Sequence, residues 1–232
     1  MQVKEKMSGP QFVQSVVGLK PKLAVFDCDG TLWSGDAGAD FFFWEIKRGL
    51  IPREVVDWVV PRYGDYKAGR VEEDVMCGEM VTINKGIPEE KLRAAAEEFF
   101  EEVVAMRIFP QMQELAMELG SRDCDLWAVS STNNWVVEAG VRRFGIPIEH
   151  VLAACVHIEN GCASGRLRDV PTDEGKASAI KKHLPGKSPD VAFGNSSHDV
   201  HMLELARHPF AIAPDEVLDR VARERGWTVY RP

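Results

Sequence analysis

The sequence predicts an α/β fold: a parallel sheet between two layers of helices, interrupted by an all-helical insertion. From residue 111 onward, short apolar runs typical of buried strands alternate with amphipathic segments typical of helices. Between residues 39 and 107 no strand pattern stands out, and this stretch is far longer than a simple βαβ crossover requires. We therefore expect a core domain formed by residues 1–35 and 108–232, and a helical cap formed by residues 36–107.

The elements are predicted in chain order from periodicity, caps and breakers. Residues 1–20 resemble a weak leader that could contain a helical turn, and the first strand covers residues 22–26 after Pro21. In the cap, helices are expected over 40–48, 52–60 (ended by Pro61), 70–84 and 88–107. Further helices are expected over 111–120, 133–144, 173–183, 197–206 and 215–225, and strands over 125–129, 190–193, 210–213 and 227–230. Residues 151–158 and 163–170 flank Asn160-Gly161, which predicts a hairpin.

Composition excludes several classes of protein. The 232 residues carry a net charge of -8, which disfavours nucleic acid as a partner and offers no basic patch for a membrane surface. No apolar run is long enough for a signal peptide or a membrane span. The five cysteines form no CxxC pair, so reduced thiols in a cytoplasmic protein are expected rather than disulfides or zinc. A monomer or homodimer is expected.

Two carboxylates follow the first predicted strand. Asp27 and Asp29 are separated by Cys28, and Gly30-Thr31 comes next. Because Gly30 permits a turn, both acids would lie at the carboxyl end of the strand, where open α/β sheets bind ligands. Neighbouring anions are reasonable there if they hold a hard cation such as Mg²⁺. The alternative is an Asp-Gly turn with two solvated acids.

Three later segments also follow a strand or begin a helix. Ser130-Ser131-Thr132-Asn133 forms either an anion site or an ordinary N-cap cluster. Lys176 lies in the first turn of a helix, where it opposes the helix dipole unless a phosphate or the acidic pair is near; otherwise it is a surface lysine. Asn195 and Asp199 could complete an oxygen-only metal shell, or belong to a polar loop.

Together these segments read FDCDGTL, AVSST, GKASAI and FGNSSHDVHML in chain order. The set resembles the haloacid dehalogenase-like hydrolase superfamily, and more closely its phosphoserine-phosphatase-like branch. In that branch a helical cap lies between the first two motifs of a Rossmann-like core. The resemblance covers the chain from about residue 22 onward.

The resemblance implies a role for each matching residue. Asp27 would be the nucleophile and Asp29 the general acid and base, while Ser130 and Lys176 would bind and neutralise the phosphoryl group. Mg²⁺ would be held by Asp27, the backbone carbonyl of Asp29, Asn195 and Asp199. The last motif of the family usually begins Gly-Asp, so Gly194-Asn195 lacks one negative charge. Phosphate contacts are expected from Gly30, Thr31, Ser131 and Thr132.

The predicted activity is Mg²⁺-dependent hydrolysis of a small phosphorylated metabolite. A phosphotransferase or mutase using the same aspartyl-phosphate is one alternative, and a non-catalytic phospholigand-binding protein is another. The aromatic run Phe41 to Trp44 would mainly pack cap against core, although a cage for an amine is a sharper hypothesis. Asp36, Asp40 and Glu45 could pair with the amine of phosphoserine, phosphoethanolamine or phosphocholine, or could be solvated acids.

Overall fold

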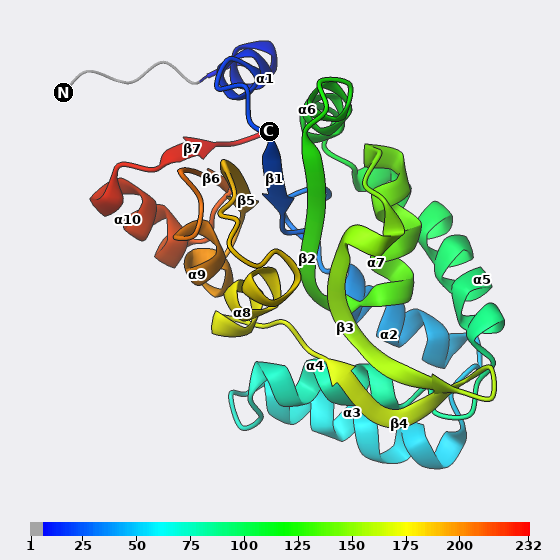
Figure 1. Ribbon diagram of the computed structural model, residues 1–232. Helices are drawn as coiled ribbons and strands as arrows, with labels where there is room; N and C mark the ends of the chain where they lie inside the picture. Colours follow the sequence, from blue (N-terminus) through cyan, green and yellow to red (C-terminus); the bar gives the residue numbers. More distant parts are fainter. Residues whose placement is uncertain (1–6) are drawn as a thin grey trace.

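The computed structural model describes residues 7–232, which contain a seven-stranded sheet with helices on both faces (Figure 1). The strand order is β4-β3-β2-β1-β5-β6-β7. All neighbouring strands are parallel except β3 and β4, which form the antiparallel hairpin expected around Asn160-Gly161. The strands are β1 Leu23–Phe26, β2 Asp125–Asn133, β3 Val151–Glu159, β4 Cys162–Asp169, β5 Val191–Gly194, β6 His208–Ile212 and β7 Thr228–Tyr230. The predicted α/β, Rossmann-like fold is confirmed.

Strand β1 lies at the centre of the sheet and fixes the position of the acidic stretch. All four of its residues are buried, as expected for a strand covered on both faces. Phe26, its last residue, pairs with Ala128 of β2 and with Phe193 of β5. Strands β1 and β5 therefore end nearly level, whereas β2 continues past its pairing with Phe26 to Asn133. The loops that follow β1 and β5 begin side by side.

Helices cover the sheet in two layers. One face carries α1 Gly9–Val17, α5 Glu89–Phe99, α6 Pro110–Gly120 and α7 Asn134–Val141. The other carries α8 Glu174–His183, the short α9 Val200–Leu203 and α10 Glu216–Arg225. Among residues 7–232, no helix is both long and apolar enough to cross a membrane.

Helix α1 is longer than the single helical turn that the weak leader over residues 1–20 was expected to contain. Ser8 caps the helix, and Phe12 and Val16 are fully buried beneath it. The ring of Phe12 stacks on Tyr230 of β7 at a centroid distance of 3.9 Å. A nine-residue amphipathic helix is marginal alone, so this tertiary packing stabilises it. Residues 1–6 of the expected leader lie outside the described part.

The helical insertion between β1 and β2 comprises α2 Ala37–Lys47, α3 Arg53–Lys67, α4 Glu73–Thr82 and α5. Helices α2, α3 and α4 share a small core of their own, formed by Phe42, Ile51, Val59, Val71, Met76 and Ile83. Helix α5 instead packs on α7, and its Leu92 and Phe99 join the core beneath the sheet. The two-domain boundary at residues 36–107 stays a prediction.

Two predicted helix limits in the insertion are wrong. Helix α3 continues through Pro61 to Lys67 instead of ending before the proline. Pro61 is exposed, so the backbone group that loses its hydrogen bond can reach water, while Val59 on the other side is fully buried. The helix expected over 88–107 is α-helical only to Phe99 and continues as a π turn at Phe100–Val104, which lets Phe99 and Phe100 both be buried.

Candidate active site

A cavity of about 250 Å³ lies where the carboxyl ends of β1, β2 and β5 face helices α3 and α4 of the insertion. The core side of its lining comprises Asp27, Asp29, Ser130, Ser131, Thr132, Lys176, Asn195, Ser196 and His198. The insertion contributes Tyr63, Tyr66, Glu73, Met76, Cys77 and Met80, and the segment after β1 adds Gly35, Asp36 and Gly38. A larger hollow of about 690 Å³ beside α1 and β6 contains none of the predicted site residues.

Asp27 lies directly after β1 and is held by two donors. Its Oδ1 accepts a hydrogen bond from Nζ of Lys176 at 2.8 Å, and its Oδ2 accepts one from the Thr31 hydroxyl, also at 2.8 Å. Nζ of Lys176 also donates to Oδ1 of Asp199 at 2.6 Å. All three charged side chains are buried, and the single lysine lies between the two carboxylates.

The charges of this cluster do not balance. Burial and the nearby Asp199 raise the pKa of Asp27 to about 7, against the opposing effect of Lys176. For Lys176, burial alone would lower the pKa, but Asp199 and Asp27 raise it above its ordinary value, so the ammonium stays charged. Two buried acids with a single cation fit a site that binds a further positive ion, which would lower the pKa of Asp27.

Asp29 is two residues away but has different neighbours. Its Oδ1 accepts from Nε1 of Trp33 at 2.6 Å and from the backbone N–H of Ala37 at 3.0 Å, while its Oδ2 accepts from the Thr132 hydroxyl at 2.7 Å. Burial, followed by Asp36, raises its pKa to about 6 against these three donors. Within residues 7–232, the hydrogen-bond partners of Asp29 are neutral and include no lysine.

Asn195 packs directly on the turn of the acidic stretch. Gly30 has a φ of +73°, and a Cβ there would lie 1.9 Å from Nδ2 of Asn195, so only glycine allows this approach. Asp199 supports the same loop, because its Oδ2 accepts from the backbone N–H groups of Asn195 at 2.9 Å and Ser196 at 3.0 Å. Both oxygens of Asp199 thus have donors, and its role as a metal ligand stays a prediction.

The oxygen atoms gathered at this cavity are suitable ligands for a hard cation. The Asp27 carboxylate and the Asn195 amide line the same cavity, and the backbone carbonyl of Asp29 belongs to the turn on which Asn195 packs. Oxygen donors of this kind are those that Mg²⁺ prefers. The residues present therefore fit the ion that the sequence predicts.

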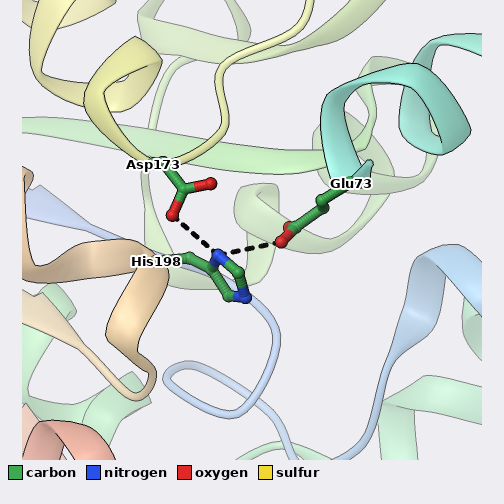
Figure 2. Close-up of side chains that lie close together, drawn as sticks. All are labelled: Glu73, Asp173 and His198. Atoms are coloured by element: carbon green, nitrogen blue, oxygen red, sulfur yellow. Dashed lines mark hydrogen bonds and ion pairs between the residues drawn. The ribbon is translucent and has the colours of Figure 1, made fainter. Parts of the chain in front are cut away.

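A second ionic cluster at the cavity connects the insertion to the core (Figure 2). Nδ1 of His198 lies 2.9 Å from Oε2 of Glu73 on α4 and 2.8 Å from Oδ1 of Asp173, which precedes α8. The hydrogen bond to Glu73 is the main cause that raises the pKa of His198 to about 9. The nitrogen of His198 and the carboxylate oxygens of Glu73 and Asp173 lie within 4.8 Å of one another, which is close enough to bind a metal ion. The two ion pairs, however, explain why these side chains lie together without a metal ion.

The residues predicted to contact the substrate lie in different surroundings. Ser131, Thr132 and Asp36 line the cavity. The hydroxyls of Thr31 and Thr132 donate to Asp27 and Asp29, respectively. Asp40 lies outside the lining and forms an ion pair with Arg107 at 2.5 Å. The cavity therefore gives no support to the predicted substrate contact of Asp40, which stays a prediction.

The aromatic run of α2 does not form a cage. Phe41 and Phe42 are buried in packing contacts, and neither Phe43 nor Trp44 lines the cavity. Glu45 is likewise buried away from it. Sequence reasoning missed the aromatic residues that do line the cavity, Tyr63 and Tyr66, because it ended their helix at Pro61. It also missed Glu73 and His198, which only tertiary packing brings together.

Comparison with known proteins decides the family. A family model described as haloacid dehalogenase-like hydrolase matches residues 24–204. The chain belongs to the haloacid dehalogenase-like hydrolases. The matched segment contains the four motifs and the whole insertion.

Individual relatives agree with this assignment. A histidinol-phosphatase of Neisseria meningitidis is 24% identical over 217 residues, covering 89% of this chain and 97% of that protein. A phosphoserine phosphatase of Mycobacterium tuberculosis is 27% identical over 220 residues, covering 89% of this chain and 69% of that protein. A solved structure of phosphoserine phosphatase with a phospho-aspartyl intermediate analogue has the same fold, with a TM-score of 0.59 at 18% identity over 90% of this chain and 92% of that one. The resemblance to the phosphoserine-phosphatase-like branch is confirmed.

Proposed function

We propose that the protein is a Mg²⁺-dependent phosphatase that hydrolyses a small phosphomonoester through an aspartyl-phosphate on Asp27. The observation that carries the proposal is the unequal environment of two neighbouring carboxyl groups at the cavity. Asp27 bonds to Lys176, whereas Asp29 bonds to neutral donors and has a pKa of about 6. A nucleophile needs the first environment and an acid–base group needs the second.

In the first step, a carboxylate oxygen of Asp27 attacks phosphorus and the bond to the ester oxygen breaks. Asp29, protonated, gives its proton to the leaving oxygen. In the second step, Asp29 takes a proton from water as the water oxygen attacks phosphorus, and the bond to Asp27 breaks. Inorganic phosphate leaves, and both carboxyl groups return to their starting states.

Charge on the phosphoryl oxygens is neutralised throughout. Lys176 lies against Asp27 and would meet one oxygen, and Ser130 on β2 would donate to another. Asp27, the carbonyl of Asp29 and Asn195 would hold Mg²⁺, which supplies the remaining positive charge when bound. Asp199 keeps Lys176 and the Asn195 loop in place.

The substrate is proposed to be an amine-bearing phosphate ester. The names of two relatives, histidinol-phosphatase and phosphoserine phosphatase, both specify such esters. The acids Asp36 and Glu73 in the lining favour a positively charged leaving group.

All five cysteines are free thiols, which fits the expected cytoplasmic location.

The test is hydrolysis of p-nitrophenyl phosphate and of a panel including L-histidinol phosphate, phosphoserine, phosphoethanolamine and phosphocholine. Activity should require Mg²⁺ and stop with EDTA, and rapid acid quench should trap a phosphorylated protein with the label on Asp27. Transfer of the label to an added alcohol more readily than to water would identify a phosphotransferase instead. Binding of phosphate esters without turnover would contradict the proposal.

A further inference from the structure

The cavity offers no free positive charge to a carboxylate on the substrate. Among residues 7–232, the cationic side chains that line it are those of Lys176 and His198, and no arginine does. Lys176 is held by Asp27 and Asp199, and His198 lies between Glu73 and Asp173 (Figure 2). A substrate carboxylate would therefore enter without an unpaired cationic partner, and burying such a charge is costly.

The insertion presents aromatic rings instead. Tyr63 and Tyr66 lie three residues apart on α3, so they share a helix face, and their ring centroids are 5.8 Å apart. Ring faces attract cations. Nζ of Lys67 already lies 5.8 Å from the centroid of the Tyr66 ring, although Lys67 itself does not line the cavity.

The acids on this side of the cavity outnumber the bases. Glu73, Asp173 and the protonated His198 together carry one negative charge, and Asp36 adds another. The ion pair occupies Oε2 of Glu73, and within residues 7–232 no hydrogen bond reaches its Oε1. Burial is the main cause that raises the pKa of Tyr66 to about 12, and the nearby Glu73 and Asp36 add to the effect.

We propose that Tyr63, Tyr66 and Glu73 form a subsite for a cationic group on the leaving alcohol, and that the preferred substrates are phosphate monoesters of amino alcohols without a carboxylate. This inference rests on the proposed function, because it needs the phosphate bound at Asp27 with its ester group toward the insertion. Among the amine-bearing candidates, phosphoethanolamine is therefore expected to have a higher kcat/KM than phosphoserine. The cavity volume of about 250 Å³ limits the alcohol to a small one.

Three substrates test the inference on the unaltered protein. Ethyl phosphate, O-phosphoethanolamine and O-phospho-L-serine form a series that gains first the amine and then the carboxylate. The value of kcat/KM should rise by about tenfold or more from ethyl phosphate to phosphoethanolamine, and fall again by a similar factor for phosphoserine. Equal or faster hydrolysis of phosphoserine would overturn the inference.

Variants of the subsite sharpen the test. Glu73→Gln and Tyr66→Leu should each lower the ratio of kcat/KM for phosphoethanolamine over ethyl phosphate by roughly five- to thirtyfold, and Tyr66→Phe should retain it because the ring remains. The matched control is Asp74→Asn, which removes the same charge from the neighbouring, exposed position on α4. A ratio that is unchanged in Glu73→Gln and Tyr66→Leu, with fold shown by circular dichroism, would overturn the subsite.

The inference and the proposed function fail in different ways. Hydrolysis of all three esters without preference for the amine overturns the inference alone. If no ester is hydrolysed with Mg²⁺, the proposed function fails, and calorimetric titration with phosphoethanolamine and phosphoserine then decides the subsite by binding alone. Tighter binding of phosphoethanolamine supports it, and equal or tighter binding of phosphoserine overturns it.

Discussion

Two buried carboxyl groups, Asp27 in the core and Glu45 in the insertion, have very different hydrogen-bond partners. Asp27 in the core has a lysine on one oxygen and a threonine hydroxyl on the other. Glu45 on α2 is fully buried, and neither of its oxygens has a hydrogen-bond partner within residues 7–232. Burial raises the pKa of Glu45 well above its ordinary value, although the nearby amide of Asn84 opposes this slightly.

The difference indicates which region carries the chemistry. A charged carboxylate persists in a protein interior only where partners compensate for lost hydration. The core supplies such partners around Asp27, so the group can act as a nucleophile. Around Glu45 the insertion supplies only the nearby amide of Asn84, so burial raises the pKa of that carboxyl and favours its protonated form. Four substitutions test this contrast, from the largest expected effect to the smallest.

Asp27→Asn should lower phosphatase activity by at least about 1,000-fold, because the amide cannot form the aspartyl-phosphate. The measurement is the steady-state rate with p-nitrophenyl phosphate and Mg²⁺. Glu45→Gln, the equivalent change in the insertion, should keep the wild-type rate because Glu45 lies outside the cavity. Full activity in Asp27→Asn would refute the assignment of the nucleophile.

Lys176→Met should lower the free energy of unfolding by about 3–5 kcal/mol, because it leaves Asp27 and Asp199 buried together without a cation. Urea unfolding at neutral pH gives the value. Adding Asp199→Asn should recover part of the loss, since one of the stranded charges is removed. The control Lys181→Met, at an exposed position of the same helix, should change stability little. Similar effects at positions 176 and 181 would show that the buried cluster does not depend on its lysine.

Asn195→Asp should tighten Mg²⁺ binding by about tenfold, because it adds a negative charge where the structure packs Asn195 against the acidic turn. Asparagine and aspartate have nearly the same shape, so this tight contact can be kept. Calorimetric titration with Mg²⁺ gives the affinity. Asn160→Asp adds the same charge in the hairpin turn, outside the cavity, and should leave it unchanged. Unchanged or weaker binding in Asn195→Asp would place the ion elsewhere.

Glu45→Gln should stabilise the protein by about 1–2 kcal/mol at pH 8, the smallest effect of the four. The folded state raises the pKa of Glu45 above 4.5, so it holds the proton more tightly than the unfolded chain does. The contribution of this group to stability is therefore full below pH 4.5 and falls as the pH rises through the folded pKa.

Unfolding curves between pH 5 and pH 8 measure this effect. Glu45→Gln should show a flatter dependence on pH than the wild-type protein over this range. Glu114→Gln, at an exposed position on α6, should follow the wild type. Parallel curves for Glu45→Gln and the wild type would mean that Glu45 is ionised and partnered in the folded protein.

Local sequence signals predicted most of the fold. The apolar run of β1 and the Asn160-Gly161 turn lie where they were expected, because a buried strand and a primed turn each depend on a few neighbouring residues. Predictions failed where distant packing overrides local preference. Helix α1 forms because Phe12 stacks on Tyr230, and α3 passes Pro61 because its other side is buried.

The core side of the cavity was also predictable, since its residues lie near the carboxyl ends of strands or in the first turn of a helix. Asp27, Asp29, Ser130, Lys176 and Asn195 do meet at one cavity. The insertion side was not predictable, because helices place their side chains by how they pack. Tyr66, Glu73 and His198 come from three separate elements with no motif to connect them.

By itself, the sequence determined the α/β alternation, the helical insertion and the acids at the strand ends, because each follows from the spacing of nearby residues. Only the tertiary structure decided that Asp29 has neutral partners while Asp27 has Lys176. Only the tertiary structure, too, decided that Glu45 is buried in packing contacts and that Tyr63, Tyr66 and Glu73 line the cavity. The physical reason is that burial and charge pairing depend on which distant segments meet, and no local pattern in the chain specifies those contacts.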